Sequence, residues 1–264
     1  MQFLGLGVLT WITFLPVLGM GLVLLMNKDN KNAIRWTSVV ITALQVVLAA
    51  VIYMKFNPAL GGINTQDGFQ FVEKGSWIDI KSVSWFGRVQ IDYFLGIDGI
   101  SVLMVILTSI ISLVAVFASW SIEKSLKGYF ALLLLLDTGM MGVFVSMDFF
   151  LFYVFWEIML LPMYFLIGIW GGPRREYAAI KFFLYTLFGS VLMLLAVIAL
   201  YFSVAIVDPA TGEKVHTFNM LAMMNPANFE PGSILAGINT TWRYLAFVAL
   251  FIGFAIKVPI FPFH

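Results

Sequence analysis

The 264-residue sequence contains no cysteine and few charged side chains. Without cysteine the chain can form no disulfide and can supply no thiolate to catalysis or to an iron–sulfur cluster. Charged residues make up 11% of the sequence, against roughly 25% in soluble globular domains. The formal net charge is only +1, which gives no indication of a nucleic-acid partner. The composition therefore argues against a soluble, thiol-dependent or nucleic-acid-binding protein.

A dinucleotide-binding fingerprint is also missing. The glycine pairs Gly5–Gly7 and Gly19–Gly21 lack the third glycine of that motif, and they lie inside an apolar run. The motif requires a turn between a strand and a helix, where the helix start binds the pyrophosphate. We therefore expect no redox cofactor on this chain.

The sequence is rich instead in long apolar runs, and hydrophobic residues make up 61% of it. Seven runs come close to or exceed the roughly 20 residues that a helix needs to cross a membrane. They are Phe3–Met26, Ile34–Phe56, Ile97–Ser119, Tyr129–Met147, Phe149–Trp170, Ala178–Val207 and Trp242–Phe263. The sequence thus predicts an all-α polytopic membrane protein with a single membrane domain over residues 1–264.

Cationic residues gather in alternate short connections between these runs. They are Lys28, Lys31 and Arg35 in the first, Lys124 and Lys127 in the third, and Arg174 and Arg175 in the fifth. By the positive-inside rule these connections face the cytoplasm. The N-terminus and the two long loops, Asn57–Gly96 and Asp208–Thr241, are then predicted on the outer side. The first run lacks the basic leader and cleavage site of a secretory signal, so we expect it to stay in the mature chain.

The first long loop contains two short stretches of alternating polarity, Phe69–Glu73 and Val89–Phe94. Gly75, Ser76 and Gly87 separate them, which predicts a small outer hairpin. After the hairpin, Asp98-Gly-Ile-Ser101 provides an N-cap for the third helix. The second long loop is rich in turn-forming residues.

Two buried charges stand out in the apolar runs. Glu157 lies inside the stretch Leu151–Pro162, and Lys257 lies inside the last run. A charge in hydrocarbon costs several kcal/mol unless it faces a partner or water, so such residues indicate a functional site. Counted from Asp148 at about 1.5 Å per residue, Glu157 lies roughly 13 Å into its helix. We predict that Glu157 and Lys257 form a pair; a purely structural ion pair is the alternative, although such pairs stabilise weakly.

Prolines accompany both charges. Pro162 cannot donate a hydrogen bond to the carbonyl of Ile158, and Pro259 leaves the carbonyl of Ala255 without its usual donor. Pro262 follows in the same segment. Unpaired carbonyls at membrane depth persist only where they line protein or water. The prolines therefore predict two interrupted helices beside hydrated cavities, a feature of transport sites.

Three further residues are candidates for proton transfer. Lys181 lies one to two turns inside its helix, where it is either a functional cation or a side chain reaching the cytoplasmic surface. Asp137 lies deep in its run and either transfers a proton or hydrogen-bonds a neighbouring helix. His264 either extends a lateral path or marks a helix end.

Three blocks of sequence resemble a known family. They are Phe155–Gly172 (FWEIMLLPMYFLIGIWGG), Ala178–Thr186 (AAIKFFLYT) and Ala255–His264 (AIKVPIFPFH). In this order they resemble the subunit M (chain 4) family of NADH:quinone oxidoreductase, the antiporter-like proton-pumping subunits of respiratory complex I. The resemblance runs from about Tyr93 to His264. It implies an antiporter-like helical bundle, with these runs as the first seven spans of a longer fold built from inverted repeats.

The resemblance also implies roles for individual residues. Glu157 corresponds to the fifth-helix glutamate and Lys257 to the seventh-helix lysine of the pumping pair, and Lys181 to a sixth-helix lysine on the same path. The implied partners are other membrane subunits of complex I, including homologous antiporter-like subunits. NAD, FMN, iron–sulfur clusters and quinone are expected on other subunits, and the implied location is the bacterial inner membrane.

Two other functions remain open from the sequence. The chain could serve a cation/proton antiporter complex or a membrane-bound hydrogenase, whose subunits share the fold and the charge pair. It could also be a structural scaffold subunit whose charges do not transfer protons.

Overall fold

The computed structural model describes residues 2–3, 5–60, 68–83, 87–207, 212, 214–236 and 240–264, and most of them are helical. They form two compact units. The first comprises Met1–Glu73, Leu95–Ser146 and Val154–Ala179, and the second comprises Lys74–Phe94, Met147–Tyr153 and Ile180–His264. Helices α5 (Phe149–Ile158) and α7 (Arg175–Ser203) contribute residues to both units.

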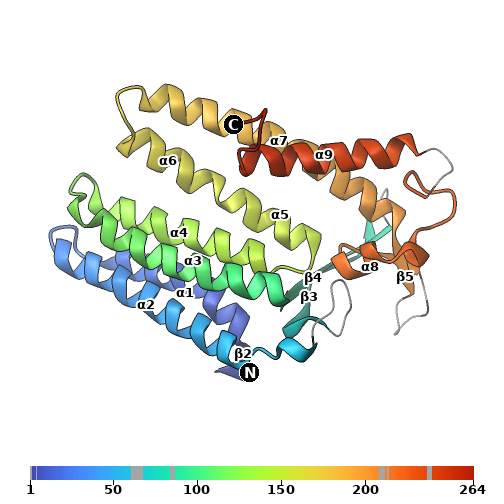
Figure 1. Ribbon diagram of the computed structural model, residues 1–264, viewed down its shortest axis with the longest axis horizontal. Helices are drawn as coiled ribbons and strands as arrows, with labels where there is room; N and C mark the ends of the chain where they lie inside the picture. Colours follow the sequence, from blue (N-terminus) through green and yellow to red (C-terminus); the bar gives the residue numbers. More distant parts are fainter. Residues whose placement is uncertain are drawn as a thin grey trace. The chain divides into compact units, whose positions relative to one another are not determined.

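The first unit is a bundle of apolar helices. Its helices are α1 (Val8–Leu25), α2 (Lys31–Lys55), α3 (Gly99–Ala118), α4 (Leu126–Val145) and α6 (Leu160–Trp170), with short 3-10 turns at Pro58–Leu60 and Ser119–Ser121. Helix α1 packs against α2 and α4, α2 against α3 and α4, α3 against α4, and α4 against α6 (Figure 1). Part of the core is formed by Val23, Ile34, Val39, Ile41, Val116, Leu126, Phe130, Ala131 and Leu134. Burial of this apolar surface holds the four N-terminal helices together.

Helix starts in this unit are capped by polar side chains. The predicted cap at Asp98 is confirmed: its carboxylate accepts from the N–H groups of Ile100 and Ser101, and the Ser101 hydroxyl accepts from the N–H of Asp98. Helix α1 follows β1 (Gln2–Phe3) and β2 (Leu6–Gly7), which pair antiparallel. Its cap comes from far along the chain, because the Glu73 carboxylate accepts from the N–H groups at the start of α1, those of Leu9 at 2.7 Å and Thr10 at 3.1 Å.

Three short connections lie at one end of the first unit. The Arg35 guanidinium donates to the Ile122 carbonyl at 3.2 Å, and the Lys127 ammonium donates to the Met26 carbonyl at 2.9 Å. The Lys124 ammonium donates to the Ile169 carbonyl at 3.2 Å. These bonds join the cation-bearing first and third connections to each other, and the third connection to the last turn of α6, directly before the fifth connection. Alternate connections of a multi-span protein must share one side in this way.

The second unit combines a hairpin, part of α7 and the segments that follow it. Its elements are β3 (Gln70–Val83, whose first four residues belong to the first unit), β4 (Gly87–Ile97), β5 (Ala205–Val207), β6 (Lys214–His216), α8 (Met220–Met224), the 3-10 turn Pro226–Asn228 and α9 (Thr241–Lys257). Strands β3 and β4 form a two-stranded sheet, and β5 pairs antiparallel with β6 through Ile206 opposite Val215. The predicted hairpin is confirmed, but both strands are longer than expected. Gly75 and Ser76 lie within β3 and Gly87 begins β4, so none of them forms the turn; residues 84–86 are outside the described part.

Six helical segments in the described part of the chain are long and apolar enough to cross a membrane. They match six of the predicted runs, with α5 and α6 together forming one of them. The seventh predicted run, Trp242–Phe263, is a regular helix only over the 17 residues of α9, a length of roughly 26 Å. The count of seven crossings therefore stays a prediction.

Candidate proton-transfer site

Glu157 lies in the last turn of α5, directly before an interruption of the helix. Helix α5 ends at Ile158 and α6 begins at Leu160, with Met159 in a turn between them. The interruption predicted from Pro162 is confirmed, and regular bonding resumes when the Met163 N–H donates to the Met159 carbonyl at 3.4 Å. Glu157 itself is partly buried.

Helix α4 approaches this interruption closely because it carries glycines there. A Cβ built at Gly142 would lie 2.2 Å from the ring of Phe155. One built at Gly139 would lie 2.5 Å from the Met159 side chain and 3.3 Å from both the Met159 nitrogen and the Phe155 oxygen. Only glycine permits such an approach. The backbone on either side of Glu157 is thus packed against α4.

Lys257 is the last residue of α9 and is partly buried. The predicted interruption of this helix is confirmed, because α9 ends at Lys257 and a turn follows at Val258 and Pro259. The prediction that the Ala255 carbonyl is unpaired is wrong. The N–H of Ile260 reaches back across Pro259 and donates to it at 2.9 Å.

Lys181 and His264 lie in the second unit with Lys257. Lys181 is exposed on α7, four residues before Tyr185 and therefore on the same face of the helix. The Tyr185 hydroxyl donates to the Phe263 carbonyl at 2.9 Å, and His264 follows directly. The ring of His264 lies 5.8 Å from that of Phe261. The face of α7 that carries Lys181 thus contacts the segment that carries His264.

Helices α7 and α9 meet at a pair of glycines in the second unit. A Cβ built at Gly253 would lie 2.9 Å from the Gly189 carbonyl oxygen and 3.0 Å from the Cβ of Met193. A Cβ at Gly189 would lie 3.0 Å from the side chain of Ile256. This contact fixes α9 against α7 one turn before Lys257.

Asp137 lies on α4 and is buried among α1 to α4. The Ser112 hydroxyl of α3 donates to its Oδ1 at 2.6 Å, so the predicted hydrogen bond to a neighbouring helix is confirmed. No local sequence pattern indicates that Ser112 or Gln45 lies beside it, because both contacts join residues far apart in the chain.

Asp148 is a second buried carboxyl, which the sequence-based site prediction did not include. Its Oδ1 accepts from the N–H groups of Phe150 and Leu151, both at 3.0 Å, and its Oδ2 accepts from the N–H of Asp92 at 3.3 Å. Asp148 therefore caps α5, the helix that carries Glu157. An aspartate directly before an apolar run is an N-cap signal that could have predicted this role.

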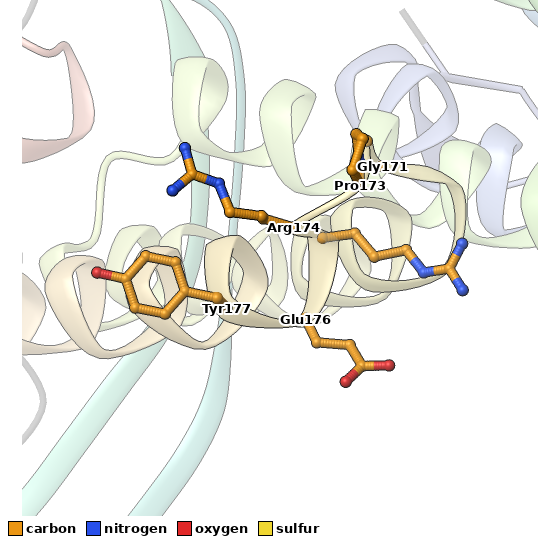
Figure 2. A pocket seen from close by; sticks show the side chains of 7 residues that line it. Gly171, Pro173, Arg174, Glu176 and Tyr177 are labelled. Atoms are coloured by element: carbon orange, nitrogen blue, oxygen red, sulfur yellow. The ribbon is translucent and has the colours of Figure 1, made fainter.

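The surface of the described part of the chain is hollowed at two places named here. One of about 740 Å³ is lined by Gly171–Tyr177, and the Arg174, Glu176 and Tyr177 side chains in it spread apart rather than converge (Figure 2). The other, of about 660 Å³, is lined by apolar residues of α7, α9 and the segment between them, together with Arg243. In the described part of the chain, no cluster of three His, Cys, Asp or Glu residues could hold a metal ion.

The comparisons with known proteins find a family match in the stretch that contains Glu157 and Lys257. Residues 146–264 match the family model described as NADH:quinone oxidoreductase/Mrp antiporter, TM. This stretch, a little under half of the chain, is therefore similar to that family. NADH-quinone oxidoreductase subunit M of Rhodobacter capsulatus is 35% identical over 97% of the chain and 46% of its own length, and that of Escherichia coli is 34% identical over 97% of the chain and 47% of its own length. The chain spans a little under half the length of these relatives.

Solved structures match nearly the whole chain in fold. Respiratory complex I from Thermus thermophilus with bound NADH matches 97% of this chain and 45% of the matched chain, at 22% identity and a TM-score of 0.68. An archaeal membrane-bound sulfane sulfur reductase matches 97% of this chain and 35% of the matched chain, at 23% identity and a TM-score of 0.65. The antiporter-like helical fold predicted from the sequence is therefore confirmed.

Proposed function

We propose that this chain is a proton-translocating membrane subunit of an NADH:quinone oxidoreductase. The observation that carries the proposal is the family match over 146–264, a stretch that contains Glu157 and Lys257, each at the point where an apolar helix is interrupted. In this proposal NADH and quinone react on other subunits. The partners are the other membrane subunits, the location is the bacterial inner membrane, and the N-terminus lies on the outer side.

The proposed mechanism is a relay in which Lys257 carries the proton and Glu157 sets its affinity. A nearby opposite charge changes a pKa by about 1–3, which corresponds to roughly 1.4–4 kcal/mol. Moving one proton against about 150 mV takes roughly 3.5 kcal/mol. Formation and separation of one ion pair is therefore on the scale needed to load and release one proton.

Lys181 and His264 are the next members of the proposed path. The bond from the Tyr185 hydroxyl to the Phe263 carbonyl supports this assignment, because it joins the face of α7 that carries Lys181 to the residue before His264. Pro162, Pro259 and Pro262 keep the helices irregular beside the two charges. Asp137 is not part of this path, since its hydrogen-bonding neighbours Ser112 and Gln45 lie within the N-terminal helices.

The relay is tested by substitution in the assembled complex. Lys257→Ala should abolish or strongly reduce proton pumping and the coupled turnover of NADH with quinone. Lys257→Arg should not restore either, because a guanidinium does not release its proton at accessible pH. Glu157→Gln should cause a similar loss by removing the partner charge, whereas Glu157→Asp should retain part of the activity. The measurement is proton uptake by sealed vesicles, alongside turnover.

Lys214→Ala provides a matched control. Lys214 lies on β6, and its side chain is two-thirds exposed in a 3.8 Å ion pair with Glu230. Such surface pairs contribute little, so pumping and assembly should be unchanged. Normal pumping by Lys257→Ala would overturn the relay.

Two alternative functions make different predictions. The family description includes the Mrp antiporter, so a cation/proton antiporter complex is the first alternative, and sodium-dependent transport without NADH oxidation would favour it. A membrane-bound hydrogenase would couple transport to hydrogen instead. In a structural scaffold subunit, Glu157→Gln would leave transport intact, while loss of assembly in every variant would point to a structural role for both charges.

A further inference from the structure

The bundle of α1 to α4 contains buried polar side chains that the relay does not use. Most of their hydroxyls bond to carbonyls of their own helix: Thr13 to Leu9, Ser38 to Ile34, Thr42 to Ser38, Thr108 to Met104, Ser109 to Ile106 and Thr138 to Leu134. Gln45, Ser112 and Asp137 differ, because their side chains bond between helices. These three residues are almost fully buried, with exposed fractions of 0%, 5% and 2%.

The bonds of Gln45 and Ser112 fix the orientation of the group. The Gln45 amide nitrogen, on α2, donates to the Ile12 carbonyl of α1 at 3.2 Å. The amide oxygen of Gln45, Oε1, therefore does not face that carbonyl. The Ser112 hydroxyl, on α3, donates to Oδ1 of Asp137, on α4, at 2.6 Å. The Gln45 side chain also lies within hydrogen-bonding reach of the Asp137 carboxyl. Four helices thus meet at one polar cluster.

Two oxygens of this cluster have no donor. They are Oε1 of Gln45 and Oδ2 of Asp137, and both are buried. An amide oxygen and a carboxylate oxygen are both acceptors, so they cannot bond to each other while Asp137 is ionised. An ionised carboxylate here would be a buried charge with a single hydroxyl donor, which costs several kcal/mol in an apolar surrounding.

One proton added to Asp137 would give both of these oxygens a hydrogen-bond partner. We propose that the α1–α4 bundle is a proton-binding site in which Asp137 is a neutral acid whose Oδ2–H donates to Oε1 of Gln45. The hydrogen bonds then run from the Ser112 hydroxyl to Asp137, from Asp137 to Gln45, and from Gln45 to the Ile12 carbonyl. Oδ2 of Asp137 and Oε1 of Gln45, the two oxygens without a donor, are then bonded to each other.

This proton stays on Asp137 and is not passed along a proton path. The chain of hydrogen bonds ends on the Ile12 carbonyl, and a backbone carbonyl accepts a hydrogen bond without taking up and passing on a proton. The role of Asp137 is thus to join four helices within the membrane, where its neutral form avoids the cost of a buried charge. This inference is independent of the Glu157–Lys257 relay, and its failure would leave the relay untouched.

The test compares Asp137→Asn with the wild type in the assembled complex. An asparagine amide can donate to Gln45 and accept from Ser112, so it reproduces the bonds of the neutral acid. We expect wild-type assembly, thermal midpoint and pumping rate. The infrared difference spectrum of wild type minus variant at neutral pH should contain the carbonyl stretch of a protonated carboxylic acid. Its absence would overturn the proposal and favour an ionised Asp137 bridged to Gln45 by water. Loss of pumping with normal assembly would also overturn it, since that result would make Asp137 part of a proton path.

A second pair of variants tests the direction of the proton. Gln45→Met removes the acceptor, so the acid band should shift to higher frequency as its hydrogen bond is lost. An unchanged band would show that the proton does not face Gln45. Asp137→Leu leaves the Ser112 hydroxyl and Oε1 of Gln45 without their Asp137 partner, so it should lower the thermal midpoint, unlike Asp137→Asn. Equal midpoints for the two variants would contradict the bridging role.

Discussion

At the scale of single residues, Asp148 combines burial with capping. It is 1% exposed, it accepts two N–H groups at the start of α5, and it accepts a third from Asp92 of the hairpin. Burial raises the pKa of its carboxyl to about 6, and the nearby charge of Asp92 acts in the same direction. The hydrogen bonds from the backbone N–H groups oppose this rise only in part.

This raised pKa predicts a pH-dependent stability. The unfolded carboxyl titrates near 3.9, so between about pH 4 and pH 6 the folded state binds more protons and stability falls as the pH rises. Above pH 6 the free energy of unfolding that is lost by ionising Asp148 stays constant, at roughly 3 kcal/mol. Asp148→Asn removes the ionisation while keeping an acceptor oxygen. The variant should therefore gain thermal midpoint over the wild type as the pH rises from 4 to 7, and a difference independent of pH would contradict the assignment.

The sequence predicted some members of the candidate site better than others. Glu157, Lys181 and Lys257 stood out because a charge in an apolar run is visible without any knowledge of contacts. Gln45 and Ser112 did not, since an uncharged polar residue in a membrane helix usually bonds to its own backbone. Their importance comes from the approach of α2 and α3 to Asp137, and no local pattern encodes that approach.

At the scale of helices, the glycines of α4 allow a direct test of the packing beside Glu157. Gly142→Ala places a methyl group 2.2 Å from the ring of Phe155, so the helices must separate or the ring must move. Such overpacking typically costs about 1–3 kcal/mol. We expect a lower thermal midpoint and reduced assembly of the complex.

Gly128→Ala is the matched control for this prediction. Gly128 lies on the same helix, and a Cβ there meets nothing within 4 Å. Replacement of a helical glycine by alanine at such a site should stabilise by about 0.5–1 kcal/mol. Equal effects of the two substitutions on the thermal midpoint would show that α4 does not pack closely against Phe155.

The helices themselves were largely predictable, because apolar runs of sufficient length have few other stable structures in a membrane. The ends of the helices were less predictable. Helix α1 begins at Val8 rather than Phe3, and its N–H groups are capped by Glu73, a residue 64 positions beyond Leu9. The Ala255 carbonyl was expected to be unpaired, yet the chain turns after Lys257 and Ile260 supplies the donor. Both results depend on how the chain folds back, which neither capping rules nor proline rules describe.

At the scale of the whole molecule, the predicted orientation in the membrane rests on the distribution of cations. Arg35, Lys124 and Lys127 donate to carbonyls at one end of the first unit, and thus stabilise the connections that the positive-inside rule assigns to the cytoplasm. Cations near helix C-termini are also favoured by the helix dipole. The residues that stabilise these connections are thus also the ones on which the predicted orientation rests.

Sided labelling tests this topology. Helix α7 has 29 residues and is roughly 43 Å long, enough to cross the membrane, so we expect the residues before and after it to lie on opposite sides. Because the chain contains no cysteine, Arg174→Cys and Lys214→Cys each introduce a single thiol into it. In sealed inside-out vesicles an impermeant maleimide should label the subunit of the Arg174→Cys variant, and in right-side-out cells the subunit of the Lys214→Cys variant. Labelling of both from one side would show that α7 does not cross the membrane, while the reverse pattern would invert the predicted orientation and leave the crossing intact.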